Sequence, residues 1–502
     1  MGGARAGEGL QLEGLPFDNT YARLPGAYYA RLDPTPLPRP ELVAFNPDAA
    51  ALIGLDPAEA ARPEFADYFS GNRRLPGSDP LAMLYAGHQF GHYVSQLGDG
   101  RAILLGEVRG ADGVAWDLHL KGAGHTPFSR DGDGRAVLRS TVREYLACEA
   151  LHGLGIPSTR ALCIVAGDEE VYRERIERGA MLLRLAPSHV RFGSFEVFYY
   201  REQYHRLGEL ADYVIDHDFP HLTAAPDRYR RLLAEVVERT ADLVAGWQAV
   251  GFAHGVMNTD NMSILGITLD YGPYGLLDEY DPGFVCNHSD RWGRYAFDRQ
   301  PHVAHWNLGR LAQAMLPVLA PEPEKAAEVA YDLIGPYQAR YAESYLKRMR
   351  AKLGLREARE GDQALLDRLL HLLAASRVDY AIFFRSLGTF RQAAGERSDR
   401  VRDQFLDRDG FDAWARDYRA RLVSEGSDDR RRQARMDREN PRYVLRNYLA
   451  QKAIDAAEGG DYAEVERLRR LLAKPFDEHP GMESYAGYPP DWARRIVVSC
   501  SS

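Results

Sequence analysis

One stretch of the sequence, HGVMNTDNMSILGITLDYG at residues 254–272, concentrates side chains that can bind a cation and move a proton. Asn261 and Asp270 offer oxygen atoms, which are the ligands that Mg²⁺ and Mn²⁺ prefer when they hold a phosphate. Asp260 stands directly before Asn261 and offers a carboxylate that can accept a proton from an attacking hydroxyl. Together these residues predict metal-assisted transfer of a phosphate-containing group.

The spacing of these residues is typical of the catalytic and metal loops of protein kinases. Those loops place an Asp two residues after a His, an Asn five residues later, and an Asp-Phe-Gly motif further on. Asn261 and Asp270-Tyr271-Gly272 fit this pattern relative to His254, but Val256 occupies the position of the catalytic Asp. The alternatives are a conventional kinase, an ATP-binding pseudokinase scaffold, and an enzyme with different chemistry in which Asp260 replaces the missing carboxylate.

A glycine-rich turn upstream can hold phosphate. Gly98 and Gly100 precede Arg101, and glycine lets backbone N–H groups approach phosphate oxygens. The next expected strand ends at Lys121, and the expected helix behind it carries Glu144, an order that is typical of the nucleotide site of kinases. An ordinary hairpin turn and two unrelated surface charges are the alternatives.

Two further segments offer groups for an anion. Asp131-Gly132-Asp133-Gly134-Arg135 resembles part of a calcium loop, but the sequence lacks the bidentate Glu of an EF-hand at the required distance. We expect a glycine-rich loop at a helix N-terminus, where backbone amides favour anions. Arg184 lies inside an apolar run and needs an anionic partner if buried, so Arg184 and Arg191 are candidates for phosphate contact. Surface solubility is the alternative.

The pattern of apolar residues predicts an α+β protein with the bilobal order of kinases, a β-rich N-lobe before a helical C-lobe with extra helices. We expect residues 1–80 to form an N-terminal extension that packs on the lobes, residues 81–200 the nucleotide-binding N-lobe, and residues 201–502 the C-lobe with the catalytic and metal loops. Expected strands are 100–108, 114–122, 161–165, 180–185, 262–265 and 275–277. Expected helices are 136–154, 228–250, 304–316, 325–353, 362–390, 441–457 and 461–473. Residues 424–440 are expected as a solvated loop or helix face.

Composition narrows the class of protein. The net charge of −9 and a pI of about 6.0 argue against bulk binding of nucleic acid. The sequence shows neither a signal-peptide core nor an apolar run of the ~20 residues that a membrane span needs. Four cysteines without metal spacing exclude a disulfide scaffold. We expect a cytoplasmic monomer that binds neither membranes nor nucleic acid, with His88 and His92 as structural histidines.

Several long motifs, in order, resemble the selenoprotein O family of protein adenylyltransferases. They are YAGHQFGHYVSQLGDGRAILLGE, HLKGAGHTPFSRDGDGRAVLRSTVREYL, HGVMNTDNMSILGITLDYGPYGLLDEYDPGFVCNHSD, GRYAFDRQPHVAHWNLGRLA and the terminal SCSS. The resemblance implies a kinase-like fold with a flipped nucleotide. It also implies transfer of AMP, with UMP as a further option, from the nucleotide to Ser, Thr or Tyr hydroxyls of proteins, including the enzyme itself.

The same resemblance implies roles for individual residues. Asp260 would be the proton acceptor, and Asn261 and Asp270 would bind Mg²⁺ or Mn²⁺. Glu144 would support Lys121. The residues expected to bind ATP are Gly98, Gly100, Arg101, Lys121, Asp133, Gly134, Arg184 and Arg191.

The cysteines suggest a redox contact near the chain end. Cys500 stands where eukaryotic members of the family carry selenocysteine. Cys148 falls on an expected helix and Cys163 in an apolar strand, so we expect both to be buried, whereas Cys286 falls in a loop where exposure is expected. We therefore predict a reversible Cys286–Cys500 disulfide, with an unpartnered terminal thiol as the alternative.

Overall fold

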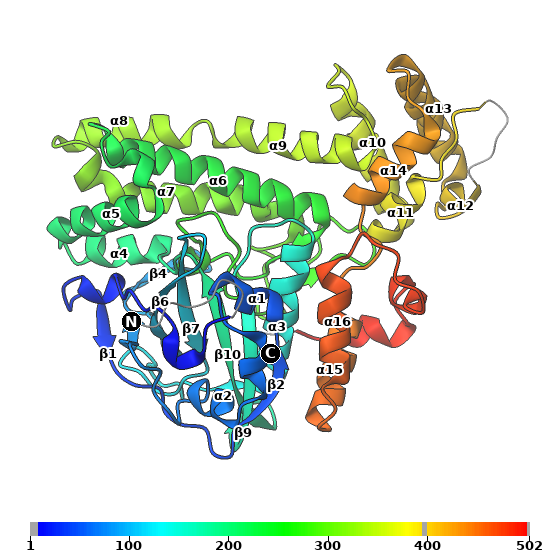
Figure 1. Ribbon diagram of the computed structural model, residues 1–502. Helices are drawn as coiled ribbons and strands as arrows, with labels where there is room; N and C mark the ends of the chain where they lie inside the picture. Colours follow the sequence, from blue (N-terminus) through cyan, green and yellow to red (C-terminus); the bar gives the residue numbers. More distant parts are fainter. Residues whose placement is uncertain (1–8, 394–398, 499–502) are drawn as a thin grey trace.

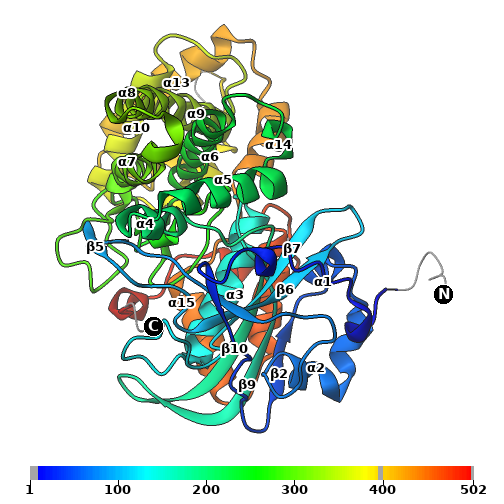
Figure 2. The same ribbon diagram turned by 90° about the vertical axis from the view of Figure 1, so that its left-hand side faces the viewer.

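A twisted antiparallel sheet and a large group of helices form two regions of the molecule (Figures 1 and 2). The computed structural model describes residues 9–393 and 399–498. The mixed α and β composition expected from the sequence is confirmed, with strands concentrated before residue 187 and helices after it. Within the described ranges, no helix is both long and apolar enough to cross a membrane.

The main sheet gathers strands from the first 186 residues. All of its pairings are antiparallel, and β8 (Ala136–Val137) pairs with β10 beside the main path. The order is β1 (Tyr29–Arg31), β3 (Leu81–Met83), β6 (Ala102–Arg109), β7 (Ala115–Lys121), β10 (Ile176–Ala186), β9 (Arg160–Tyr172) and β2 (Glu41–Phe45). Because β1 and β2 form its two edges, residues 1–80 contribute strands to the sheet and do more than pack against it.

Helix α3 (Leu138–Gly153) lies against the sheet and is buried along most of its length. It contacts β9 and β10 on one side and α15 (Asn447–Glu458) and α16 (Ala463–Ala473) on the other. The last helices of the chain therefore pack beside the sheet region (Figure 1). Two short helices, α1 (Pro47–Leu52) and α2 (Pro63–Tyr68), belong to the N-terminal segment.

The helical region follows the sheet in the chain. Its elements are α4 (Phe192–Tyr200), α5 (Tyr204–Asp218), α6 (Arg228–Val250), α7 (Gln300–Leu319), α8 (Pro323–Ile334), α9 (Tyr337–Lys352), α10 (Asp362–Ser376), α11 (Tyr380–Leu387), α12 (Asp399–Arg402), α13 (Arg408–Ser424) and α14 (Asp429–Glu439). The expected helix 228–250 is confirmed as α6.

Several expected boundaries were wrong for identifiable reasons. The expected helix 325–353 is two helices, since Pro336 lacks an N–H and interrupts the helical hydrogen bonds after Gly335. The expected helix 362–390 breaks at Arg377, whose φ of 50° is left-handed. Residues 262–265 form a loop, with one isolated bridge between Ser263 and Arg191. The segment 424–440, by contrast, is a solvated helix face as expected, since α14 buries only Arg432 and Met436.

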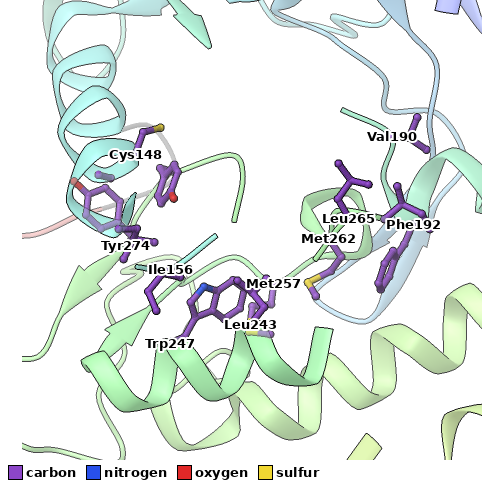
Figure 3. Close-up of a cluster of buried hydrophobic side chains, with 14 of the residues drawn as sticks. Cys148, Ile156, Val190, Phe192, Leu243, Trp247, Met257, Met262, Leu265 and Tyr274 are labelled. Carbon is purple, nitrogen blue, oxygen red and sulfur yellow. The ribbon is translucent and has the colours of Figure 1, made fainter. Parts of the chain in front are cut away.

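A continuous hydrophobic core supports the loop that carries the catalytic motif (Figure 3). Met257 and Met262 lie on either side of the short 3₁₀ helix Thr259–Asn261 and are buried. Trp247 of α6 packs beneath this loop and donates a hydrogen bond from Nε1 to Thr268 Oγ1 at 2.9 Å. The buried side chain of Trp247 therefore anchors this loop against α6.

A second hydrophobic core joins α9, α10, α11, α13 and α14. Lys352, the last residue of α9, is 5% exposed within it, and its Nζ lies 4.5 Å from the ring centre of Phe384. Burial, opposed only in part by Glu439, lowers the pKa of Lys352 to about 7. This core therefore contains a lysine that is easily neutralised.

We predict that Lys352→Met stabilises the protein near pH 7 and that the gain shrinks towards pH 10. The unfolded chain keeps Lys352 protonated up to a pKa of about 10.4, so between pH 7 and 10.4 the unfolded state binds an extra proton. The free energy of unfolding of the wild type therefore rises with pH in this window. Thermal melts should show a gain of about 1–3 kcal/mol at pH 7.

The exposed Lys347 on the same helix provides the matched control, because Lys347→Met removes an equal charge without changing a buried group. A melting difference that is the same for both variants, or that does not change with pH, would contradict the assignment.

Candidate active site

A cavity of about 820 Å³ lies between the sheet and the loop of residues 254–273. Its wall contains every residue that was expected to bind nucleotide or metal, together with the expected base: Gly98, Gly100, Arg101, Lys121, Asp133, Gly134, Arg184, Arg191, Asp260, Asn261 and Asp270. Glu144 lies behind this wall on α3. Residues separated by more than 170 positions in the sequence therefore meet at one site.

A buried ion-pair chain forms the floor of the cavity. Lys121, at the end of β7, pairs with Glu144 Oε2. The other oxygen of Glu144 accepts from Arg184 Nη1 of β10 at 2.9 Å. Lys121 and Arg184 approach the same carboxylate because β7 and β10 are adjacent strands and α3 packs across them. The predicted Lys121–Glu144 pairing is present, and Arg184 is the buried arginine with anionic partners that the sequence indicated.

Asp270 lies between the two arginines of the site. Its Oδ1 accepts from Arg184 Nη1 at 2.5 Å, and its Oδ2 accepts from Arg191 Nη1. Burial acts to raise the pKa of Asp270, but Arg191, Arg184 and Lys121 outweigh it and hold this pKa well below its usual range. Asp270 also has a φ of 58°, a left-handed conformation that is uncommon for a non-glycine residue. The surrounding charges therefore hold an ionised carboxylate in a strained position.

Arg191 connects the metal loop with the catalytic loop. The same Nη1 that contacts Asp270 also donates to the backbone oxygen of Asp260 at 2.9 Å. The guanidinium lies 4.5 Å from the ring centre of Tyr85, which supports it from one side. Arg191 is 2% exposed, so its charge acts in a region from which water is largely excluded.

Asp260 has the environment of a proton acceptor. It sits in the 3₁₀ helix Thr259–Asn261, is 7% exposed, and lines the cavity. Gln89 Nε2 donates to its Oδ2 at 3.3 Å, while its Oδ1 is buried without a hydrogen-bond partner among the described residues. Burial raises the pKa of Asp260 to about 7. A cavity-lining carboxylate with a raised pKa is suited to receive a proton from a substrate hydroxyl.

The backbone at Val256 has a role that its side chain does not suggest. Its carbonyl oxygen accepts from Asn261 Nδ2 at 3.0 Å, which fixes the amide nitrogen and leaves Asn261 Oδ1 as the group that can bind a cation. The position of the missing kinase carboxylate thus orients the expected metal ligand.

A metal ion fits this site only with help from its substrate. Asn261 and Asp270 supply the oxygen donors of the expected pair, and within the described ranges no cluster of three His, Cys, Asp or Glu side chains could hold a metal ion. Mg²⁺ and Mn²⁺ are commonly held by one or two protein oxygens together with phosphate and water. The donor set therefore suits a cation that arrives with a nucleotide.

A histidine that the sequence analysis did not single out links the glycine-rich turn to the ion-pair chain. His119 Nδ1 accepts from Arg184 Nη2 at 2.8 Å, and its Nε2 donates to Asp99 Oδ2 at 3.1 Å. Burial lowers the pKa of His119, in agreement with the neutral ring that this geometry requires. His119 stands two residues before Lys121 on the same strand, so the alternation of strand side chains placed it on the Lys121 face.

The turn itself is formed around Asp99. Asp99 Oδ2 also accepts from the backbone N–H of Met83 at 3.0 Å, and Thr126 Oγ1 donates to the Asp99 carbonyl at 2.7 Å. Gly98 has a φ of 82°, and a Cβ there would lie 2.6 Å from the ring of Phe128. The turn therefore requires glycine at this position.

A second feature that the sequence analysis did not predict is the hairpin of β4 (Gly87–Gln89) and β5 (His92–Val94). It lies directly on the catalytic loop, since a Cβ at Gly87 would meet Asp260 Oδ1 at 2.8 Å. The N–H of His88 donates to Thr259 Oγ1 at 2.7 Å, and His88 Nδ1 contacts Glu196 Oε2 at 2.5 Å. His88 is therefore structural, as expected, and the hairpin brings Gln89 into contact with Asp260.

The outer part of the cavity differs from the floor. Asp133 is exposed and forms a two-point ion pair with Arg173, at 2.7 and 2.9 Å. Arg173 is the main cause of the lowered pKa of Asp133. Arg101 is also exposed. These groups lie where solvent and an incoming ligand have access.

The cysteine predictions have different outcomes. Cys148 and Cys163 are buried, as expected. Cys286 was expected to be exposed, but it is 8% exposed and its Sγ donates to Pro273 O at 2.8 Å, because the loop folds back against the metal loop. Cys500 lies outside the described residues. The backbone of Val498 accepts from the N–H of His288 at 2.9 Å, and the Cys286–Cys500 bond stays a prediction.

Comparison with known proteins places this site in a family. The family model described as protein adenylyltransferase SelO matches residues 11–473. The chain therefore belongs to the SelO family.

Curated relatives cover almost the whole chain. The protein nucleotidyltransferase YdiU of Myxococcus xanthus (strain DK1622) is 58% identical over 491 residues, which cover 98% of this chain and 99% of the relative. The protein of the same name in Thioalkalivibrio sulfidiphilus (strain HL-EbGR7) is 58% identical over 492 residues, or 98% and 100% of the two chains. The protein of the same name in Stutzerimonas stutzeri (strain A1501) is 55% identical over 488 residues, or 97% and 99%. These names support nucleotidyl transfer, and they support neither a conventional kinase nor a pseudokinase scaffold.

We predict that Asp270→Asn lowers the melting temperature of the ligand-free protein and that pyrophosphate restores it. The variant leaves Arg191 without its carboxylate partner, while Arg184 keeps Glu144. Breaking a buried ion pair costs on the order of 3 kcal/mol, and we expect a fall of about 3–6 °C. Melts with EDTA and added pyrophosphate measure both effects. Asp298→Asn, at an exposed carboxylate, is the control, and equal melting of the two variants would refute the prediction.

Proposed function

We propose that this enzyme transfers AMP from ATP to Ser, Thr or Tyr hydroxyls of proteins, including its own, and releases pyrophosphate. The observation that carries the proposal is the arrangement of Lys121, Arg184 and Arg191 around two carboxylates at the floor of the cavity. In AMP transfer the negative charge grows on the departing β- and γ-phosphates. Fixed positive groups that face this growing charge stabilise the transition state.

The charge balance of the floor supports a polyanionic ligand. Three cations face Glu144 and Asp270, so the floor carries one positive charge in excess. The ATP phosphates would contact Lys121, Arg184 and Arg191, and Asn261 and Asp270 would hold the Mg²⁺ or Mn²⁺ that accompanies them. Such an ion supplies further neutralisation of phosphate charge. The backbone at Gly98 and Gly100, with Arg101, Asp133 and Gly134, would bind the remainder of the nucleotide.

The proposed step transfers one proton and exchanges one bond. The acceptor hydroxyl oxygen forms a bond to the α-phosphorus, and the bond from that phosphorus to the bridging oxygen of pyrophosphate breaks. The hydroxyl proton passes to the carboxylate of Asp260, which lines the cavity, and both electrons of the broken bond leave with pyrophosphate. Gln89 donates to Oδ2 of this carboxylate, and Oδ1 lies against Gly87 of the β4–β5 hairpin. Val256 has no part in proton transfer.

The architecture supports a kinase-like fold for this enzyme. The sheet provides Lys121 and Arg184, α3 provides Glu144, and the loop resting on α6 provides Asp260, Asn261 and Asp270, in the chain order that kinases use. We propose residues 81–200 as the core of the nucleotide-binding lobe and residues 201–502 as the second lobe, with residues 1–80 completing the sheet. We propose that the enzyme acts as a monomer in the cytoplasm.

The position of the radioactive label distinguishes the reactions. Label on the α-phosphate of ATP should enter the enzyme and acceptor proteins, whereas label on the γ-phosphate should leave as pyrophosphate. Protein labelled only from the γ position would show a conventional kinase. Binding of ATP without transfer from either position, with both metals tried, would indicate a scaffold.

Asp260→Asn should separate catalysis from binding. We expect kcat for AMP transfer to fall by about 10²-fold or more, because the base acts in the transition state. The Kd for ATP should stay within about twofold of the wild type, because Asp260 does not belong to the ion-pair chain at the cavity floor. Asp281→Asn, at an exposed carboxylate, controls for charge. Full turnover by Asp260→Asn would remove Asp260 from the mechanism.

A further inference from the structure

A second cavity of about 600 Å³ lies beside the candidate active site. Its wall is formed mainly by the segment 290–306, with the aromatic rings of Phe90, Trp292 and Trp306 and the cationic groups of Arg294 and Arg299. Trp292 is 90% exposed, which is unusual for so large an apolar side chain. We call this feature the aromatic groove.

The aromatic groove is continuous with the catalytic loop through the β4–β5 hairpin. Phe90 lines both cavities. Its backbone N–H donates to Asn258 Oδ1 at 3.1 Å and to Tyr295 OH at 3.0 Å, and Asn258 stands two residues before Asp260. The preceding residue, Gln89, contacts Asp260 itself. A chain that lies in the groove therefore passes close to the carboxylate that would accept the hydroxyl proton.

The charge of the groove indicates the sign of its ligand. Among the described residues no ion pair to a carboxylate is found for Arg294 or Arg299: Arg299 Nη1 donates to the Trp292 carbonyl at 3.4 Å, and Arg294 lies over the Trp306 ring. Asp290, the one acidic residue of the wall, uses Oδ1 and Oδ2 to accept the backbone N–H groups of Arg294 and Tyr295, at 2.9 and 2.8 Å. The charges of the two guanidinium groups are therefore not neutralised within the groove, and their remaining N–H groups can bind a carboxylate from outside the chain.

The aromatic wall indicates the second property of the ligand. Trp306 is braced by Arg294, whose Cζ lies 4.8 Å from its ring centre, and by an edge contact with His88 at 5.3 Å. A rigid indole beside an exposed one offers apolar surface to a side chain at a low cost in conformational entropy. The groove is distinct from the phosphate-binding floor, which carries the nucleotide.

We propose that the aromatic groove binds the segment of the protein substrate next to the acceptor hydroxyl and selects one acidic and one apolar or aromatic side chain. This inference rests on the proposed transfer of AMP to proteins. Because Phe90 lines both cavities and Gln89 beside it contacts Asp260, the recognised side chains lie a few residues from the hydroxyl in the substrate sequence. The groove also accounts for the hairpin, which supports Asp260 on one side and the substrate on the other.

Synthetic peptides with one Tyr or Ser acceptor test the proposal. Peptides that carry Asp and Phe near the acceptor should receive AMP with a KM about 10-fold lower than peptides with Lys and Ala there. Trp292→Ala should raise the KM for the Asp-Phe peptide about 10-fold, whereas the Kd for ATP should match the wild type. Tyr331→Ala, at an exposed aromatic residue on α8, is the matched control.

A charge exchange makes the test specific. Arg299→Glu should lose the preference for the Asp peptide and gain one for the peptide in which Lys replaces that Asp. Arg438→Glu, at an exposed arginine on α14, should keep the wild-type preference.

The failure of this proposal can be told from the failure of the proposed function. Equal KM values for all peptides in the wild type, Trp292→Ala and Arg299→Glu, with AMP transfer continuing, would overturn the groove assignment alone. Absence of transfer from α-labelled ATP to any peptide and to the enzyme itself would overturn the function on which it rests.

Discussion

The partly buried carboxylate of Asp270, held by the buried Arg184 and Arg191, forms the interaction on which the site depends. Two arginines cannot be buried side by side without an anion, because their repulsion and the loss of hydration would be too costly. Asp270, which follows the catalytic loop in the chain, supplies a carboxylate to both arginines, and Glu144 on α3 supplies a second carboxylate to Arg184. One group of ion pairs therefore holds the sheet, α3 and the loop that carries Asp270 together. The cations of this group can also bind an incoming polyphosphate.

The second requirement concerns Asp260, whose carboxylate must lie near this charge group without forming an ion pair with it. Arg191 contacts only the backbone of Asp260, so its positive charge does not pair with the carboxylate. The β4–β5 hairpin covers the side chain, and Trp247 with its neighbours supports the loop from below. An ionised, fully paired carboxylate would be a poor base, whereas a buried one with an unsatisfied oxygen is basic near neutral pH. The different surroundings of Asp260 and Asp270 thus suit two different tasks.

The same hairpin shows how one small element can serve several purposes. Its strands form a two-stranded sheet separate from the main sheet, and its backbone and side chains contact Thr259, Asn258 and Asp260. The tip residue Phe90 lies between the candidate active-site cavity and the aromatic groove and lines both. A motif that appears in the sequence only as two histidines among glycines therefore organises the acceptor side of the site.

The sequence by itself determined the participants of the site. The spacing of Asn261 and Asp270, the apolar setting of Arg184 and the order of Lys121 and Glu144 predicted a phosphate site, and these residues do line or support one cavity. Local patterns also predicted α6 and the strands β6, β7, β9, β10 and β12 (Gly275–Leu276) near their observed positions, because hydrophobic periodicity and glycine turns are local signals.

Only the tertiary structure decided which groups meet. That His119 joins Asp99 to Arg184, that Cys286 is buried, and that β1 and β2 complete the sheet all depend on contacts between distant segments. The aromatic groove likewise exists because the hairpin at residue 90 lies beside the segment 290–306. Long-range packing fixes burial, and burial decides whether a charge, a thiol or a ring is available to a partner.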